Sequence, residues 1–237
     1  MRSRMLNATL FALSLAANTP AAQHASSVWL NDSYTLEVVA DDTAVPREQL
    51  LRAAEAAAAT WNDNGVGPQI LVVPAADGVH GGFHMDGHNT LSLVTAAWDG
   101  NPQAAALTMR SVVHGAQDAI LEVDTKVNAA DWSFVDGSER GSIDLQSVLT
   151  HEFGHTLGLV DDFEHEEATM FYGSKDKDTS KRDLSSEDTD AVHALYTGVK
   201  LDRGGAGCNA AGLPAAPAVT ALAFFCIARR RRAARRS

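Results

Sequence analysis

The 237-residue sequence predicts one mixed α/β domain of the α+β kind, a sandwich of sheet and helices, flanked by two ends that do not belong to it. The apolar pattern changes from alternation to helical spacing and back, in the order strand, helix, strands, helix. We find no internal repeat, and residues 27–200 are numerous enough for a single sizeable core. These observations favour one compact domain.

The first half of this domain predicts a strand, a helix and two short strands. Residues 34–39 alternate as a strand does. Pro46 then opens a helix whose apolar residues recur at helical spacing as far as Trp61. Two short apolar runs, 70–73 and 90–94, predict buried strands.

The second half predicts one more strand and two helices. Residues 119–127 alternate apolar with charged side chains, which predicts a half-exposed strand. Ser142 or Asp144 can cap the next helix, which ends at Gly158. A last helix covers 186–196, with an inner side that we expect to be made by Ala191, Ala194 and Leu195.

The N-terminal residues 1–25 resemble a secretory signal peptide. Arg2 and Arg4 precede an apolar run of suitable length, and small residues follow where a cleavage region would lie. We therefore expect a mature protein that is secreted or placed at the cell surface.

Residues 201–237 combine a glycine-rich linker, Cys208, an apolar segment and a terminal arginine cluster. An apolar run followed by arginines is typical of a membrane stop, yet sixteen residues of helix span about 24 Å, short of a hydrocarbon core of roughly 30 Å. The order of these features resembles the C-terminal sorting tails of myxobacterial surface proteins. That resemblance implies membrane contact only through the tail, before it is processed near Cys208.

Charge and cysteine usage narrow the partners. Without the signal-like segment and the six arginines of the terminal cluster, 11 basic residues face all 30 acidic ones, so the middle carries a charge of about −19. This argues against nucleic acid as a partner. Both cysteines, Cys208 and Cys226, lie in the tail, so the domain holds no disulfide.

The second predicted helix carries a metal-binding pattern. His151 and His155 stand four residues apart, so their imidazoles leave the same helix face and can bind one metal ion. Glu152 lies beside them, as in the H-E-x-x-H arrangement, where zinc polarises a water and the glutamate takes its proton before passing it to the leaving amine. Zinc is therefore the predicted cofactor.

The residues after the helix supply a candidate third ligand. Gly158 lets the chain turn sharply, and Asp161 follows three residues later. Asp162 and His165 remain alternatives for the third ligand.

The pattern His151-Glu152-x-x-His155-x-x-Gly158-x-x-Asp161 resembles the extended zinc motif of the metzincin metalloproteases, in the minority form of the snapalysin-like proteases with an aspartate as third ligand. Ala168-Thr169-Met170-Phe171-Tyr172 resembles the family's methionine turn, and the helix 186–196 resembles the closing helix of matrixins. The likeness covers most of 27–200, and is strongest over 144–196.

This resemblance implies a twisted sheet with an active-site helix beneath it, and a small C-terminal subdomain with Met170 in the methionine turn and the closing helix. It implies a zinc endopeptidase whose peptide substrate adds a strand to the edge of the sheet. Tyr172 would donate a hydrogen bond to the oxyanion of the tetrahedral intermediate, although a half-buried core tyrosine explains it equally well. No cysteine precedes the domain, so a thiol-on-zinc latency switch of the matrixin kind cannot operate.

Two further groups of polar residues are candidates for metal sites. His80, His84, Asp86, His88 and His114 could form a second site, but glycines surround them and a polar loop is the preferred interpretation. Exposed aspartates could bind calcium, or simply form a solvated acidic face: Asp176, Asp178 and Asp183.

The leading prediction is an active, monomeric zinc endopeptidase acting on proteins or peptides. One alternative is a surface binding protein that keeps the metzincin fold with weak or no turnover, which the intact Glu152 disfavours. Another is a metal-dependent hydrolase of a different bond, because the helix activates water without specifying the acyl group.

Overall fold

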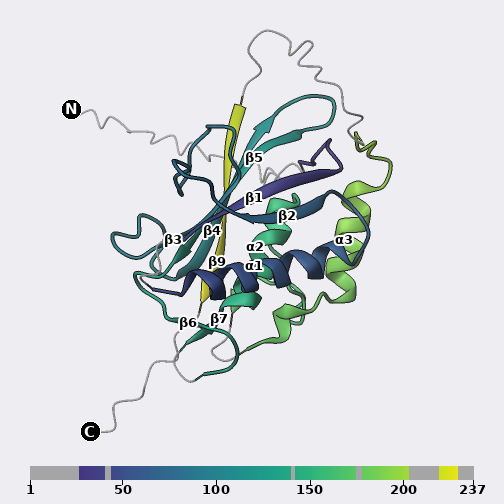
Figure 1. The fold of residues 1–237 in the computed structure, drawn as a ribbon. Helices are drawn as coiled ribbons and strands as arrows, with labels where there is room; N and C mark the ends of the chain where they lie inside the picture. The colour runs from purple at the N-terminus through teal and green to yellow at the C-terminus, as the bar shows by residue number, and fades with distance from the viewer. Residues whose placement is uncertain (1–26, 41–43, 140–141, 175–177, 203–218, 229–237) are drawn as a thin grey trace, which may run out of the picture.

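A computed structural model describes residues 27–40, 44–139, 142–174, 178–202 and 219–228. The predicted signal peptide, Asp176 and both the linker and the arginine cluster of the tail lie outside these residues. The mixed α/β architecture is confirmed: a twisted sheet is packed on one side by two helices, α1 (Arg47–Asn62) and α2 (Leu145–Thr156), and a third helix, α3 (Ser186–Tyr196), lies beside them (Figure 1).

The first five strands are β1 (Ser33–Val39), β2 (Gln69–Pro74), β3 (Thr90–Val94), β4 (Ala104–Val113) and β5 (Ala119–Asn128). Two-residue strands β6 (Phe134–Val135) and β7 (Ile143–Asp144) form a small separate ladder, and β8 (Gly173–Ser174) and β9 (Val219–Ala228) complete the main sheet. Its order is β2-β1-β3-β5-β4-β9-β8. The pairs among β2, β1, β3 and β5 are parallel, whereas β4 runs antiparallel to β5 and to β9.

Helix α1 (Arg47–Asn62) confirms the helix predicted from Pro46. Pro46 occupies the N-cap with φ −55°, and the helix is rich in alanine, the strongest helix former. Its small inner face lets α2 (Leu145–Thr156) approach closely, and the Trp61 indole donates a hydrogen bond to the Thr150 carbonyl of that helix at 2.7 Å. The core between sheet and helices is closed by large buried side chains: Leu36, Leu50, Leu91, Leu149 and Phe153.

Two details differ from the sequence prediction. Strand β5 is almost wholly buried instead of half exposed, because the loops on both sides of β3 cover it. Asp124 accepts hydrogen bonds from the backbone of His84, in the loop before β3, and of Thr90, and Lys126 pairs with Asp99 in the loop after β3. In α3 (Ser186–Tyr196), Ala191 and Ala194 are exposed, whereas Leu195 packs against the core as predicted. The buried apolar side chains of this helix are the larger ones of Val192 and Tyr196.

The apolar part of the tail is a strand, not a membrane-spanning helix. Val219–Ala228 forms the ten-residue strand β9, seen as the yellow arrow in Figure 1. Within the part of the chain that the structure describes, no helix combines the length and apolar character needed to cross a membrane.

Candidate metal centre and active site

Helix α2 carries both histidines and is fixed at its start by Asp144. The Asp144 carboxylate accepts a hydrogen bond from the Ser147 backbone at 2.9 Å and so caps the first turn; of the two capping residues predicted, the structure selects this one. Arg182 also donates to it, at 2.9 Å from Nε. Burial opposes ionisation of Asp144, but the hydrogen bonds from Arg182 and Ser147 outweigh it and lower the pKa. The helix therefore starts at a defined residue and orientation.

The end of α2 is equally constrained, because Gly158 turns the chain back. Its φ is +108°, and a Cβ there would lie 2.1 Å from the Ser27 carbonyl oxygen, so no other residue fits. Trp29 donates from its indole to the Thr156 carbonyl at 2.8 Å, and the Tyr196 hydroxyl donates to the Leu157 carbonyl at 2.7 Å. The reversal brings Asp161 back over the histidine face.

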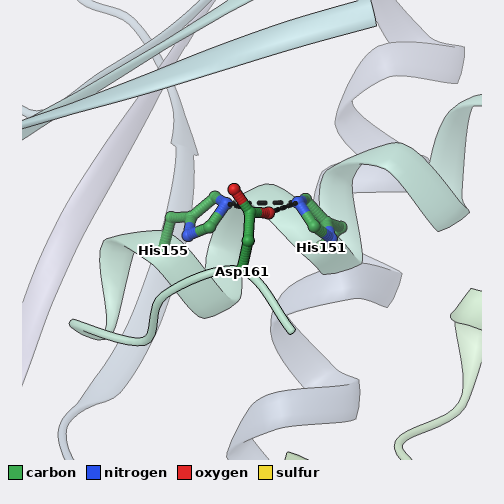
Figure 2. A group of neighbouring side chains, drawn as sticks. All are labelled: His151, His155 and Asp161. Atoms are coloured by element: carbon green, nitrogen blue, oxygen red, sulfur yellow. Dashed lines mark hydrogen bonds and ion pairs between the residues drawn. The ribbon is translucent and has the colours of Figure 1, made fainter. Parts of the chain in front are cut away.

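His151, His155 and Asp161 converge on one point, as predicted (Figure 2). The two Nε2 atoms are 3.1 Å apart, and Oδ1 of Asp161 lies 3.2 Å from Nε2 of His151 and 3.4 Å from Nε2 of His155. Ligands of one tetrahedral zinc ion with bonds of about 2.0 Å would be separated by roughly 3.3 Å. The observed separations fit that arrangement.

The protonation pattern also fits a cation. Nδ1 of His151 lies 2.8 Å from the Thr169 carbonyl and Nδ1 of His155 lies 3.1 Å from the Leu159 carbonyl, so both Nδ1 atoms must carry the proton in the neutral rings. Burial lowers the pKa of His151 to about 4, which keeps that ring neutral. Two ring lone pairs and a carboxylate oxygen thus face one another, and a metal ion is what such a group accommodates.

Asp161 is the carboxylate that the chain reversal brings to the two histidines. The Asp161 side chain is 16% exposed, and its Oδ1 is the carboxylate oxygen that faces both rings. The alternatives for the third ligand point elsewhere: the Asp162 carboxylate accepts hydrogen bonds from the backbone of Glu164 and from both the backbone and ring of His165. The structure therefore brings Asp161, and neither alternative, to the histidines.

Glu152 is fully buried beside the two histidines. Its Oε2 accepts a hydrogen bond from the Thr108 hydroxyl of β4, which also contacts the Thr125 hydroxyl of β5 at 2.9 Å. Its Oε1 has no hydrogen-bond partner among the described residues. Burial raises the pKa of Glu152 to about 7, a range suited to taking up and returning a proton near neutral pH.

Met170 lies directly beneath α2, as the resemblance implied. It is 3% exposed, and its sulfur would lie 2.2 Å from a Cβ placed on Gly154, so the helix rests on the methionine. Asp188, at the start of α3, accepts hydrogen bonds from the backbone N–H groups of Thr169 (2.7 Å) and Met170 (2.9 Å). The Thr169 carbonyl in turn accepts from His151, so Asp188 orients a histidine through the turn.

Three residues of this supporting set were not predicted from the sequence. Asp188 has a signal in the sequence, because the pattern Ser185-x-x-Asp188 is that of the capping box it forms. Thr108 and Arg110 lie on β4, for which the sequence predicted no strand. Arg110 is fully buried and donates from Nη1 to the carbonyls of His155 and Leu159, at 3.0 and 3.1 Å.

Tyr172 follows the methionine turn. Its backbone N–H donates to the Asp162 carbonyl at 3.0 Å, and its half-buried ring stacks on Phe163 with 5.1 Å between centroids. A second ring contact joins it to Phe171. Its role as an oxyanion donor stays a prediction.

The second histidine group is not assembled. His80, His84, His88 and His114 are all exposed. His88 pairs with Glu37, and His114 pairs with Asp118 at 2.9 Å. Among the described residues, the single group of metal-ligating side chains close enough to share an ion is His151, His155 and Asp161. Calcium binding by Asp178 and Asp183 stays a prediction.

Comparison with known proteins agrees with this geometry. The family model described as "Matrixin" matches residues 28–197. Metalloendoproteinase 1-MMP of Arabidopsis thaliana is 39% identical over 74 residues, which cover 30% of this chain. That alignment spans 20% of the Arabidopsis protein. Because the family model covers most of the chain, from Val28 to just after the end of α3, this protein belongs to the matrixin family of zinc-dependent metalloproteases.

Proposed function

We propose that the protein is an endopeptidase that hydrolyses peptide bonds, with zinc held by His151, His155 and Asp161 and with Glu152 as general base. The observation that carries the proposal is the convergence of three unprotonated ligand atoms beside the buried Glu152 carboxylate, whose Oε1 accepts no hydrogen bond from the described residues. Zinc, when bound, supplies the Lewis-acid chemistry that makes water nucleophilic at neutral pH. The remaining steps belong to the chain itself.

Glu152 takes the proton of the attacking water on the carboxylate and then delivers it to the nitrogen of the leaving amine. One O–H bond and the C–N bond break, while the new C–O and N–H bonds form, so one water is consumed for each peptide bond. Thr108 holds the Glu152 carboxylate through Oε2, which leaves Oε1 for this exchange. Tyr172 is proposed as a donor to the oxyanion.

The substrate is proposed to be an extended peptide that pairs with β4, because this strand borders the site and carries Thr108. Secretion or display at the cell surface, which rests on the signal-like residues 1–25, and a monomeric state belong to the same proposal. A binding protein without turnover gains no specific support, because Glu152 and all three proposed ligands are present and aligned.

The test is Glu152→Gln, which keeps the shape of the side chain and all three ligands. Peptide hydrolysis should fall by about 10²–10⁴-fold, the usual worth of a general base. Zinc content, measured by mass spectrometry of the metal, should not change. Glu55→Gln, on the exposed face of α1, is the matched control and should keep full activity. An undiminished rate of hydrolysis by Glu152→Gln would contradict the assignment of Glu152 as general base.

A further inference from the structure

Strand β9, formed by the C-terminal segment, occupies the edge of β4. It pairs antiparallel with β4 along most of that strand, from Ala104↔Ile227 to Val113↔Val219. On its other side it pairs parallel with β8, the short strand that follows the methionine turn. Segments more than a hundred residues apart in the sequence thus form one continuous sheet (Figure 1).

The register brings β9 past the catalytic carboxylate. Thr108, whose hydroxyl holds Glu152, is the β4 residue opposite Phe224. Paired strands lie about 4.8 Å apart. Strand β9 also runs along α2, with Cα atoms of the two elements within 8 Å of each other. The backbone of Phe224 therefore passes the catalytic site at one strand spacing from β4.

A peptide that binds by strand addition needs this same edge. Each strand edge offers one row of N–H and C=O groups, and one added strand uses the row up. While β9 is paired with β4, a second extended chain cannot pair there. The segment thus lies where the substrate of the proposed protease would lie.

We propose that Val219–Ala228 is a built-in occupant of the substrate groove, so that the full chain is self-inhibited until the connection 203–218 is cut. This inference rests on the proposed function. It also names the substrate class: the groove accepts an extended, uncharged, apolar segment, since all ten residues of β9 are uncharged and Val219, Phe224, Phe225 and Ile227 favour strands.

The covalent connection favours the docked state. Residues 203–218 join the strand to the domain, and a tethered ligand has an effective concentration on the order of millimolar. A substrate in free solution must compete with that concentration. Cutting the connection turns the strand into a dilute competitor, which leaves the groove open to substrate.

The experiment compares full chains that differ in the ability of β9 to pair. Ala223→Pro with Phe224→Pro removes two adjacent N–H donors and disrupts the strand. Ala210→Pro with Ala211→Pro places the same change in the connection, outside β9, as the control. Hydrogen exchange of the β4 amides reports docking without reference to activity, and hydrolysis of a fluorogenic apolar peptide reports inhibition.

The expected result is that β4 amides facing β9 exchange at least about tenfold faster in the β9 variant, and that hydrolysis rises by at least about tenfold, since a competitor at millimolar effective concentration is removed. The control should match the unaltered chain in both. A synthetic peptide of residues 219–236, added to the β9 variant, should restore protection and inhibit competitively. Equal zinc content in all chains shows that the variant has kept its site.

Equal exchange and equal hydrolysis in the two variants would overturn the docking of β9 while leaving the protease intact. Faster exchange in a β9 variant that hydrolyses no peptide would instead overturn the protease assignment, and the strand docking would stand. Faster exchange with an unchanged, measurable rate of hydrolysis would overturn self-inhibition.

Discussion

The histidines of α2 and those of the loop between β2 and β3 show what separates a metal site from a histidine-rich surface. His151 and His155 are fully buried, and each has its Nδ1 hydrogen-bonded to a backbone carbonyl. His80, His84 and His88 are exposed, and His88 pairs with a carboxylate. Histidines become ligands where helical spacing and outer hydrogen bonds fix their tautomer and direction, and the number of histidines alone predicts little.

The largest expected difference between the two regions comes from deleting one histidine in each. His151→Ala removes a proposed ligand, so the chain should lose its zinc and its peptide hydrolysis should fall to background. His84→Ala removes an exposed ring and should change neither quantity. Metal analysis after gel filtration, with a peptide assay on the same samples, measures both. Retention of stoichiometric zinc by His151→Ala would contradict the assignment of His151 as a zinc ligand.

The next largest effect is expected from changes to Asp161, the proposed third ligand. Asp161→Asn should weaken zinc binding by more than the 10–100-fold typical of an outer partner, because the site loses its anionic ligand. Asp161→His should retain zinc, since a ring nitrogen replaces the carboxylate oxygen. Asp162→Asn is the matched control and should bind zinc normally. Competition with a chromogenic chelator gives the affinities. Normal binding by Asp161→Asn, together with loss in His165→Ala, would move the third ligand to a different residue.

A smaller effect is expected from Asp188, which orients His151 through the methionine turn. Asp188→Asn should cost about 10–100-fold in zinc affinity or activity. The free energy of unfolding should fall by about 1–3 kcal/mol, because the backbone N–H groups of Thr169 and Met170 no longer share an intact buried carboxylate as acceptor. Asp190→Asn, exposed on the same helix, is the control. Thermal unfolding and chelator competition provide the measurements, and an unchanged zinc affinity would show that the turn does not position the histidine.

The smallest effect concerns His88. Its hydrogen bond to Glu37 raises its pKa. The pair therefore stabilises the fold below the ordinary histidine pKa of about 6.5, and this contribution is lost as the pH rises through the raised pKa. Glu37→Gln should return the titration of His88, followed by NMR, toward its ordinary value. Zinc in slight molar excess should leave the His88 resonance in place, and a large zinc-induced shift would reveal a second metal site.

The sequence predicted most elements because their local signals are strong. The boundaries of the β3 strand and the α3 helix agree with the prediction, and the spacing from His151 to Asp161 places the proposed ligands without any tertiary information. The alternation in β5 suggested half exposure, which failed because a loop distant in sequence covers Glu122 and Asp124.

What the sequence did not predict depends on tertiary pairing. Strand β4 is buried on both faces over its first half, so it lacks the alternation that identifies a strand, and its residues Thr108 and Arg110 remained unassigned. The pattern of the apolar segment Val219–Ala228 is compatible with a helix or a strand, because a short apolar run does not distinguish the two. The segment forms a strand because it pairs with the edge of β4.

A crystal structure of the zinc-loaded protein, with diffraction measured on both sides of the zinc absorption edge, tests the proposed zinc site directly. The ligand set His151, His155 and Asp161 predicts one strong anomalous peak within roughly 2.0–2.2 Å of Nε2 of His151, Nε2 of His155 and a carboxylate oxygen of Asp161. A principal peak at His84, His88 or His165, or the absence of a peak between the two α2 histidines, would contradict it.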